Sequence, residues 1–257
     1  MELEINRFKA ALRKGRQQFG LWCTLPGGYV AEAIAGSGFD WLLFDTEHSP
    51  ADPLTVLQPL QAVARYPVAA VVRPASNDAV LIKRLLDLGV QSLVIPYVQS
   101  AAEARAAVAS TRYPPEGIRG VAALTRATRF GRVADYAKRA HEELAVVVQV
   151  ETRAALDALE DIVTVEGVDG VFVGPGDLAA TLGFPGEPHH EEVKRTIEET
   201  VRRIRTCGKA AGVLATDLLF ARRCMELGAT FTAVGIDVGV LTRGAEELVQ
   251  QFRDLKA

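Results

Sequence analysis

The chain has 257 residues, of which 49% are hydrophobic and 24% are charged, an ordinary composition for a globular protein. Its 29 basic and 32 acidic residues give a formal net charge of -3. Because these charges are scattered, no block of one sign is available to bind nucleic acid or a membrane surface. No window approaches the roughly 18 continuous apolar residues of a membrane span. We therefore expect neither kind of partner.

The N-terminus and the cysteines predict a cytoplasmic protein. Residues 1–9 alternate charged and apolar side chains and lack the features of a signal peptide. The three cysteines, Cys23, Cys207 and Cys224, are odd in number and show no C-x-x-C spacing. This favours neither a disulfide framework nor a thiolate metal site, so we expect buried packing residues in a reducing cytosol.

After a short helix at 6–14, apolar runs typical of strands covered on both faces alternate with helical patterns. The predicted strands are 19–25, 41–44, 68–72, 92–95, 145–150, 168–173, 212–215 and 231–235. The predicted helices that follow them are 29–35, 53–65, 77–88, 101–110, 154–165, 190–206, 218–227 and 241–255.

Eight strands alternating with eight helices predict an α/β fold, a closed (β/α)8 TIM barrel forming a single domain over 1–257. An open doubly wound sheet would need a G-x-G-x-x-G turn after its first strand, which residues 25–29 do not supply. One insertion, Tyr113 to Arg132, interrupts the alternation before the fifth strand. Loops of this length inside a compact domain are usually functional or form interfaces.

Polar side chains follow the C-terminal ends of the predicted strands. In a parallel barrel these ends meet at one mouth, where such enzymes keep their chemistry. We therefore expect an active site there. The residues concerned are Trp22, Asp45, Glu47, His48, Arg73, Gln149, Glu151, Asp177 and Asp237.

Glu151 and Asp177 follow two neighbouring strands. Each acid alone is explained as a helix cap, but together at the mouth they predict a metal site. Hard oxygen ligands favour Mg2+ or Mn2+ over structural zinc. Such a metal could bind a 2-oxo acid and act as a Lewis acid for the enolate formed when a C3 proton or the C3–C4 bond is lost.

Arg73 and His48 are the predicted catalytic side chains. Arg73 would place a fixed cation beside the enolate oxygen, and its structural alternative is an ion pair with Asp45 or Glu47. His48 is the one histidine at the predicted mouth, and we expect it to exchange protons directly or through a water. The alternative is a purely structural histidine.

Several further residues are predicted to contact substrate. The tripeptide Gly174, Pro175 and Gly176 lets the backbone approach a ligand, and the amides after it can hold a carboxylate. Because no strand end carries a lysine, an imine mechanism is disfavoured. The other candidate contacts are Trp22, Gln149, Leu214 and the 124–132 loop, the loop either from the same chain or from a neighbour.

Five segments resemble the HpcH/HpaI family of class II, metal-dependent pyruvate aldolases. This family includes 4-hydroxy-2-oxoheptanedioate and 2-keto-3-deoxy sugar acid aldolases, and the resemblance runs from about Phe19 to Leu241. The segments, in order, are FDTEHSP at 44–50, VRP at 72–74, EGIRGV at 116–121, QVET at 149–152 and VGPGDL at 173–178.

The resemblance implies a homo-hexamer, a trimer of dimers in which the last helix, about 241–256, is exchanged between partners. It also implies Mg2+, Mn2+ or Co2+ held by Glu151 and Asp177, an enolate stabilised by Arg73 and proton exchange by His48. Gly176 stands where many members have alanine, which would loosen the carboxylate pocket.

The resemblance also associates an aspartate matching Asp87 with the histidine. Since Asp87 is expected on the barrel face opposite the mouth, we hypothesise that it reaches His48 of a neighbouring subunit. The alternatives are that Asp87 is an exposed acid near a helix end and that Asp45 is the partner of His48 within its own subunit.

The predicted function is a carbon–carbon lyase, a metal-dependent aldolase joining and splitting pyruvate or hydroxypyruvate and an aldehyde. One alternative is a thioester lyase similar to the citrate lyase beta subunit. It would need a coenzyme A pocket, for which the basic cluster Arg126, Arg129 and Arg132 is the one candidate. The other alternative is a non-catalytic barrel that binds 2-oxo acids.

Overall fold

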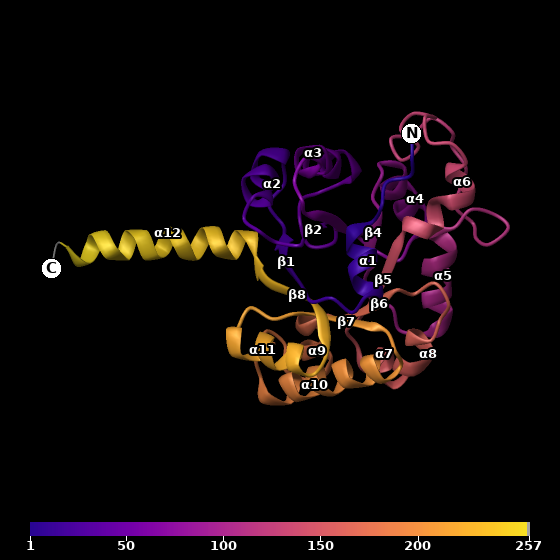
Figure 1. Cartoon of the computed structure of the whole chain (residues 1–257). Helices are drawn as coiled ribbons and strands as arrows, with labels where there is room; N and C mark the ends of the chain where they lie inside the picture. Colours follow the sequence, from indigo (N-terminus) through magenta and orange to yellow (C-terminus); the bar gives the residue numbers. More distant parts are fainter. Residues whose placement is uncertain (256–257) are drawn as a thin grey trace.

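The computed structural model describes residues 1–255, which form a closed barrel of parallel strands in the order β1 to β8 (Figure 1). The TIM-barrel prediction is confirmed. The strands are β1 (Gln18–Cys23), β2 (Trp41–Asp45), β3 (Ala69–Arg73), β4 (Ser92–Ile95), β5 (Ala145–Val150), β6 (Gly170–Val173), β7 (Ala210–Leu214) and β8 (Ala229–Ile236).

Helices connect the strands and cover the outside of the barrel (Figure 1). They are α1 (Arg7–Arg13), α2 (Gly28–Ala35), α3 (Pro53–Val63), α4 (Ala79–Asp87), α5 (Ala101–Thr111), α6 (Tyr136–Arg139), the 3-10 turn η1 (Ala140–Glu143), α7 (Arg153–Asp157), α8 (Leu159–Val163), α9 (Pro175–Thr181), α10 (Glu191–Thr206), α11 (Leu218–Glu226) and α12 (Asp237–Asp254).

The helix predicted over 154–165 is two short helices, so that prediction was wrong in detail. The break lies at Ala158, whose ψ of 15° departs from helical geometry. Ala and Leu are good helix formers and neither Gly nor Pro marks the break, so local propensity could not reveal it. The last helix begins at Asp237 rather than at 241, and residue 256 of its predicted span lies outside the described residues.

Aromatic side chains fill the N-terminal end of the barrel interior. Phe8 on α1 is buried, and its ring centroid lies 5.9 Å from that of Trp41 and 5.6 Å from that of Phe231, both edge-on. Edge-to-face contacts of this kind are favourable for aromatic rings. Phe8 and these rings therefore close this end of the barrel interior.

Two of the cysteines, Cys23 and Cys224, are buried, whereas Cys207 is half-buried, so the packing expectation was too strong for Cys207. All three are free thiols. Within residues 1–255 no helix has both the length and the apolarity needed to cross a bilayer.

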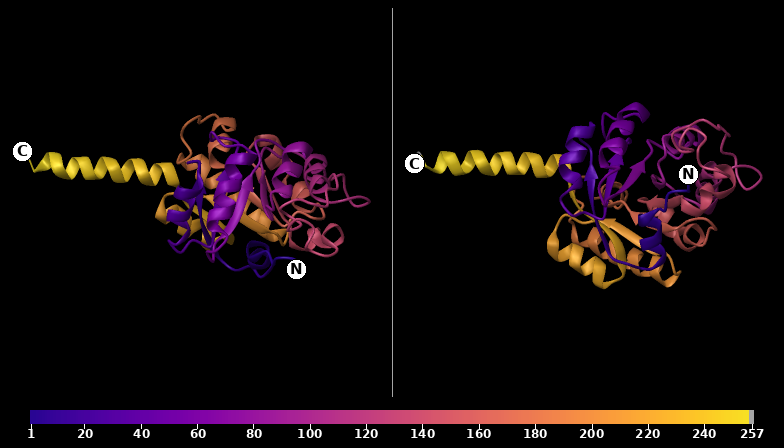
Figure 2. Two further views of the ribbon diagram at one scale, coloured as in Figure 1. Left: turned by 90° about the horizontal axis from the view of Figure 1, so that it is seen from above. Right: turned by 45° about the horizontal axis from the view of Figure 1, so that its top comes forward.

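Helix α12 projects away from the barrel in every view (Figures 1 and 2). It carries exposed large apolar side chains along its length, an arrangement that usually marks an interaction surface. Exchange of this helix between subunits remains a prediction, and it would cover these exposed apolar side chains. These side chains are Val240, Leu241, Leu248, Val249 and Phe252.

The interior rings fit only because glycine faces them. A Cβ atom added to Gly20 would lie 2.1 Å from the ring of Trp41, which is fully buried and has no room to move. At Gly36 an added Cβ would meet only Tyr66, at 3.8 Å, an ordinary contact.

We predict that Gly20→Ala lowers the free energy of unfolding by roughly 1–3 kcal/mol, because it overpacks a rigid interior. The matched variant Gly36→Ala is expected to change it by less than about 0.5 kcal/mol. Urea denaturation followed by circular dichroism measures both. Equal effects of the two substitutions would contradict the packing argument.

Candidate active site

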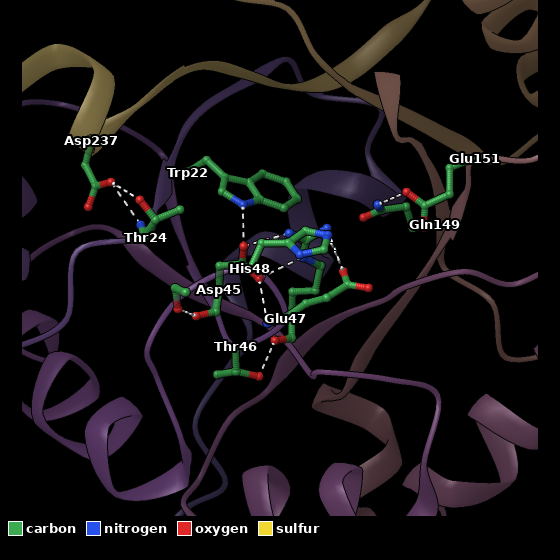
Figure 3. Close-up of polar contacts among 11 residues, drawn as sticks. Trp22, Thr24, Asp45, Thr46, Glu47, His48, Gln149, Glu151 and Asp237 are labelled. Carbon is green, nitrogen blue, oxygen red and sulfur yellow. Dashed lines mark hydrogen bonds and ion pairs between the residues drawn. The ribbon is translucent and has the colours of Figure 1, made fainter. Parts of the chain in front are cut away.

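The strand ends bring the predicted polar residues to one mouth (Figure 3). Figure 3 shows His48, Asp45 and Glu47 in the centre, Glu151 with Gln149 to one side, and Asp237 with Thr24 to the other. The residues come from the ends of β1, β2, β3 and β5 and the starts of α9 and α12. The structure thus gathers side chains that lie far apart in the sequence.

Arg73 and Asp45 form a buried, two-pronged ion pair. The Nε and NH2 atoms of Arg73 donate to the Oδ1 and Oδ2 atoms of Asp45 at 2.8 and 2.6 Å. The indole Nε1 of Trp22 also donates to Asp45 Oδ2, and the Trp22 ring lies 4.7 Å from Arg73 Cζ. Stacking and bidentate pairing together fix the guanidinium plane.

Burial raises the pKa of Asp45, but the hydrogen bond and charge of Arg73 outweigh it, so its pKa lies below the ordinary range of an aspartate. Both partners are almost fully buried. The structural alternative considered for Arg73, an ion pair with Asp45 or Glu47, is therefore present with both acids.

Glu47 links Arg73 to His48. Its Oε2 lies 2.8 Å from Arg73 NH1 and 4.0 Å from His48 Nε2. Burial raises the pKa of Glu47, and the charge of Arg73 partly offsets this. Sequence reasoning placed Glu47 at the mouth and named it only as one of two possible ion-pair partners of Arg73. Its position two residues after Asp45, whose Oδ1 accepts from the Glu47 amide, was the available signal.

Glu151 is held across the mouth by two donors. Its Oε1 accepts from the backbone amide of Tyr97 at 2.8 Å, and its Oε2 accepts from Gln149 Nε2. Tyr97 adopts a left-handed φ of 56°, uncommon for a non-glycine residue and often found at functional sites. Nothing in the sequence singled out Tyr97, since its contribution is a backbone amide.

Position 174 must be a glycine because the Glu151 carboxylate lies directly against its backbone. A Cβ atom at position 174 would lie 2.4 Å from Glu151 Oε2, so any side chain there would displace the carboxylate. Gly176 is different, because a Cβ there would meet nothing within 4 Å. An alanine thus fits at 176, and the glycine leaves open space next to the first turn of α9.

Asp177 lies in that first turn with an exposed side chain. Burial is the main reason that the pKa of Glu151 is raised, and the negative charges of Asp177 and Glu47 add to it. Three carboxylates thus lie within electrostatic range, an arrangement that a cation relieves. The donor set is all oxygen and fits a hard divalent cation.

Within residues 1–255 no three or more His, Cys, Asp or Glu side chains are grouped to hold a metal ion. A metal bound by the two predicted ligands, Glu151 and Asp177, would have two protein carboxylates. Most of its coordination positions would then remain open to substrate and water.

Asp87 and Asp237 are engaged by other partners. Asp87 ends α4, and its Oδ1 accepts from Arg119 NH2 at 2.9 Å. Asp237 accepts from the amides of Thr24 and Leu25 and so fastens the start of α12 to the loop after β1. Neither Asp87 nor Asp45 forms a hydrogen bond or ion pair with His48 within the described part of one chain.

The remaining candidate contacts divide into two groups. Leu214, at the end of β7, packs against the same interior cluster as Trp22 and lies at the mouth. The 124–132 loop instead lies beside the N-terminal segment, where Arg129 pairs with Glu4 and Arg132 O accepts from the N-terminal amine (Figure 2). Within its own chain this loop can reach neither an aldehyde nor a thioester at the mouth.

We predict that Asp45→Asn destabilises the protein by about 3 kcal/mol at neutral pH, because it leaves the buried guanidinium without its main partner. The pKa of Asp45 is depressed in the folded state, so its stabilising contribution is full at neutral pH and is lost as pH falls through that value. The difference in free energy of unfolding between the original protein and Asp45→Asn should therefore become smaller in acid. Urea denaturation across a pH series, with the exposed Asp161→Asn as control, tests this; a gap that widens in acid would refute it.

A sequence model of the family described as HpcH/HpaI aldolase/citrate lyase matches residues 18–243. A Rhizobium etli protein named pyruvate aldolase is 62% identical over 252 residues, covering 98% of this chain and 99% of its own. A Shigella sonnei 4-hydroxy-2-oxo-heptane-1,7-dioate aldolase is 54% identical, covering 96% and 95%. The crystal structure of an HpcH/HpaI aldolase/citrate lyase family protein from Burkholderia cenocepacia J2315 matches with a TM-score of 0.93 at 38% identity, covering 96% and 99%. The chain belongs to the HpcH/HpaI aldolase/citrate lyase family.

Proposed function

We propose that this protein is a metal-dependent aldolase that reversibly joins pyruvate or hydroxypyruvate to an aldehyde. The observation that carries the proposal is the position of Arg73, a buried cation fixed by Asp45 and Glu47 at the same mouth as Glu151 and Asp177. A fixed cation near paired carboxylates suits a reaction in which an enolate forms beside a metal. The names of the Rhizobium etli and Shigella sonnei relatives favour pyruvate as the 2-oxo acid.

Glu151 and Asp177 would hold the divalent cation, Mg2+, Mn2+ or Co2+. When bound, such a cation supplies Lewis acidity toward the oxygens of the 2-oxo acid. Tyr97 and Gln149 keep the Glu151 carboxylate turned toward the mouth through their hydrogen bonds. Gly174 leaves the space that this carboxylate occupies.

Arg73 stabilises the enolate oxygen at C2. A guanidinium has five N–H donors, and two of those on Arg73 are used by Asp45, while the Nη1 atom forms an ion pair with Glu47. The remaining donors are available to the substrate oxygen. Because the ion pairs already fix the side chain, little reorganisation is needed as negative charge develops.

His48 handles the proton. Its side chain is 64% exposed and projects over the mouth, where an aldehyde would enter (Figure 3). In cleavage it takes the proton of the 4-hydroxyl as the C3–C4 bond breaks and its electrons pass to the C2 oxygen. In the reverse reaction, the aldol addition, His48 returns that proton to the new 4-hydroxyl group. Trp22 and Leu214 contact the aldehyde. The substrate carboxylate is held by the backbone amides at the start of α9, those of Gly176 and Asp177, which follow Pro175.

We further propose that the active site is completed in a homo-hexamer of exchanged dimers. Two observations support this: α12, which carries exposed apolar side chains, projects away from its own barrel (Figure 1), and Asp87 pairs with Arg119 and not with its own His48. Arg119 fixes the Asp87 carboxylate, whose side chain remains 26% exposed and therefore accessible to a neighbour.

We predict that the protein exchanges the C3 protons of pyruvate in D2O, that EDTA abolishes the exchange and that Mg2+ restores it. Glu151→Gln should lower the exchange rate about 100-fold or more, since it weakens the metal site. The exposed Glu166→Gln is the matched control. NMR of the pyruvate methyl signal measures the rate, and EDTA-resistant exchange would disprove the metal assignment. A protein that only binds 2-oxo acids would leave the methyl protons in place.

We also predict that His48→Asn and Asp87→Asn subunits, each inactive alone, regain a fraction of aldolase activity when mixed and allowed to exchange. A mixed oligomer would contain some sites with an intact histidine from one chain and an intact aspartate from another. Circular dichroism of each variant verifies folding before mixing. If mixed oligomers form and stay inactive, the shared-site hypothesis is wrong.

A further inference from the structure

The insertion before β5, residues 113–132, packs against the end of α4. Asp87 is the last residue of that helix. The backbone amide of Ala127 donates to the carbonyl of Asp87 at 3.1 Å, and the side chain of Arg119 donates to the Asp87 carboxylate at 2.9 Å. The insertion thus holds both the backbone and the side chain of this aspartate.

Arg119 is a fully buried arginine whose hydrogen bonding is incomplete. Its Cζ atom lies 4.6 Å from the ring centroid of Tyr113 and 5.8 Å from that of Tyr136, and these rings partly compensate its charge. Its Nε and Nη1 atoms have no hydrogen-bond partner among residues 1–255. A buried cation of this kind contributes little to stability, because the cost of removing it from water offsets its contacts. Its contact with a carboxylate is what an apolar side chain of similar length could not provide.

A rigid segment carries Arg119. Its backbone amide donates to the carbonyl of Arg112, the C-cap residue of α5, at 2.9 Å. Two residues earlier, a Cβ atom added to Gly117 would lie 2.3 Å from the carbonyl oxygen of Ala109, so the segment lies directly against α5. A group that orients another side chain needs such support.

The Asp87 carboxylate is anchored through one oxygen. Its Oδ1 accepts from Arg119, whereas Oδ2 takes part in no hydrogen bond or ion pair within residues 1–255. The side chain stays 26% exposed, so a donor from a neighbouring molecule can reach it.

We propose that Arg119 is a positioning residue for proton transfer, which orients Asp87 so that the second oxygen accepts from the imidazole of His48 in a neighbouring subunit. This inference rests on the shared active site proposed above and adds the group that sets its carboxylate. The carboxylate fixes the tautomer and plane of the imidazole, whose other nitrogen takes the proton of the 4-hydroxyl. Arg119 itself touches neither substrate nor metal.

Subunit mixing tests the proposal, because Arg119 would act on the histidine of another chain. Arg119→Met should lower the turnover of 4-hydroxy-2-oxopentanoate cleavage about 10- to 100-fold, since a misplaced proton acceptor loses that much. Mixing with His48→Asn subunits should restore activity, because some sites then combine an intact histidine with an intact Asp87 and Arg119. Mixing with Asp87→Asn subunits should restore none, because every site that keeps Asp87 lacks Arg119. Arg105→Met, an exposed arginine of α5, is the matched control and should leave turnover unchanged.

Decarboxylation of oxaloacetate separates a positioning role from a structural one. Loss of CO2 breaks the C3–C4 bond and leaves the same enolate, but no hydroxyl proton has to be removed. Arg119→Met should therefore decarboxylate oxaloacetate as fast as the original protein. Equal losses of decarboxylation and cleavage would overturn the positioning role.

Circular dichroism verifies folding, and Arg119→Lys, which keeps a cation against the rings, replaces Arg119→Met in the same mixtures if that variant does not fold. Unchanged cleavage in a folded Arg119 variant overturns the proposal. If His48→Asn and Asp87→Asn subunits fail to complement each other, the shared site is wrong and this inference falls with it. If they do complement each other while His48→Asn and the Arg119 variant do not, only the role of Arg119 is wrong.

Discussion

The ion pair between Asp45 and Arg73 is the interaction on which the mouth of this barrel depends. The two residues are register partners at the ends of β2 and β3, so the ladder itself sets them side by side. The bidentate geometry orients the guanidinium, the Trp22 ring covers it, and Glu47 forms a second ion pair with it. A buried pair of this kind is costly to break, by about 3–5 kcal/mol when one partner is removed. The same contact therefore contributes to stability and, in the proposed mechanism, orients the guanidinium that faces the enolate.

Across the mouth, the carboxylates of Glu151 and Asp177 provide the opposite half of the electrostatic arrangement. Glu151 is buried beside like charges, which raises its pKa and makes a cation the natural companion of the pair. Backbone features maintain this unfavourable placement: the left-handed Tyr97 supplies an amide and Gly174 supplies the space. The substrate would thus be held between the permanent cation Arg73 and a metal cation bound by Glu151 and Asp177.

The two ends of the barrel differ in what they leave unsatisfied. At the mouth end, α12 displays apolar side chains that its own chain does not cover, whereas Asp87, at the end of α4 on the side of the strand starts, pairs with Arg119 and stays partly exposed. Both features are understandable if subunits complete one another. These unsatisfied groups distinguish positions where a further molecule can bind from the well-paired core of the barrel.

The sequence alone determined the barrel and the membership of its mouth, because short apolar runs between helical patterns predict parallel strands, and parallel strands end together. It thereby located Arg73, His48, Glu151 and Asp177. Tertiary structure alone decided that Asp45 pairs with Arg73, that Glu47 bridges toward His48 and that the amide of Tyr97 holds Glu151. These choices depend on strand register and backbone dihedral angles, which side-chain patterns do not encode. The same holds for Asp237, whose place after β8 suggested a site residue but whose contacts fasten α12.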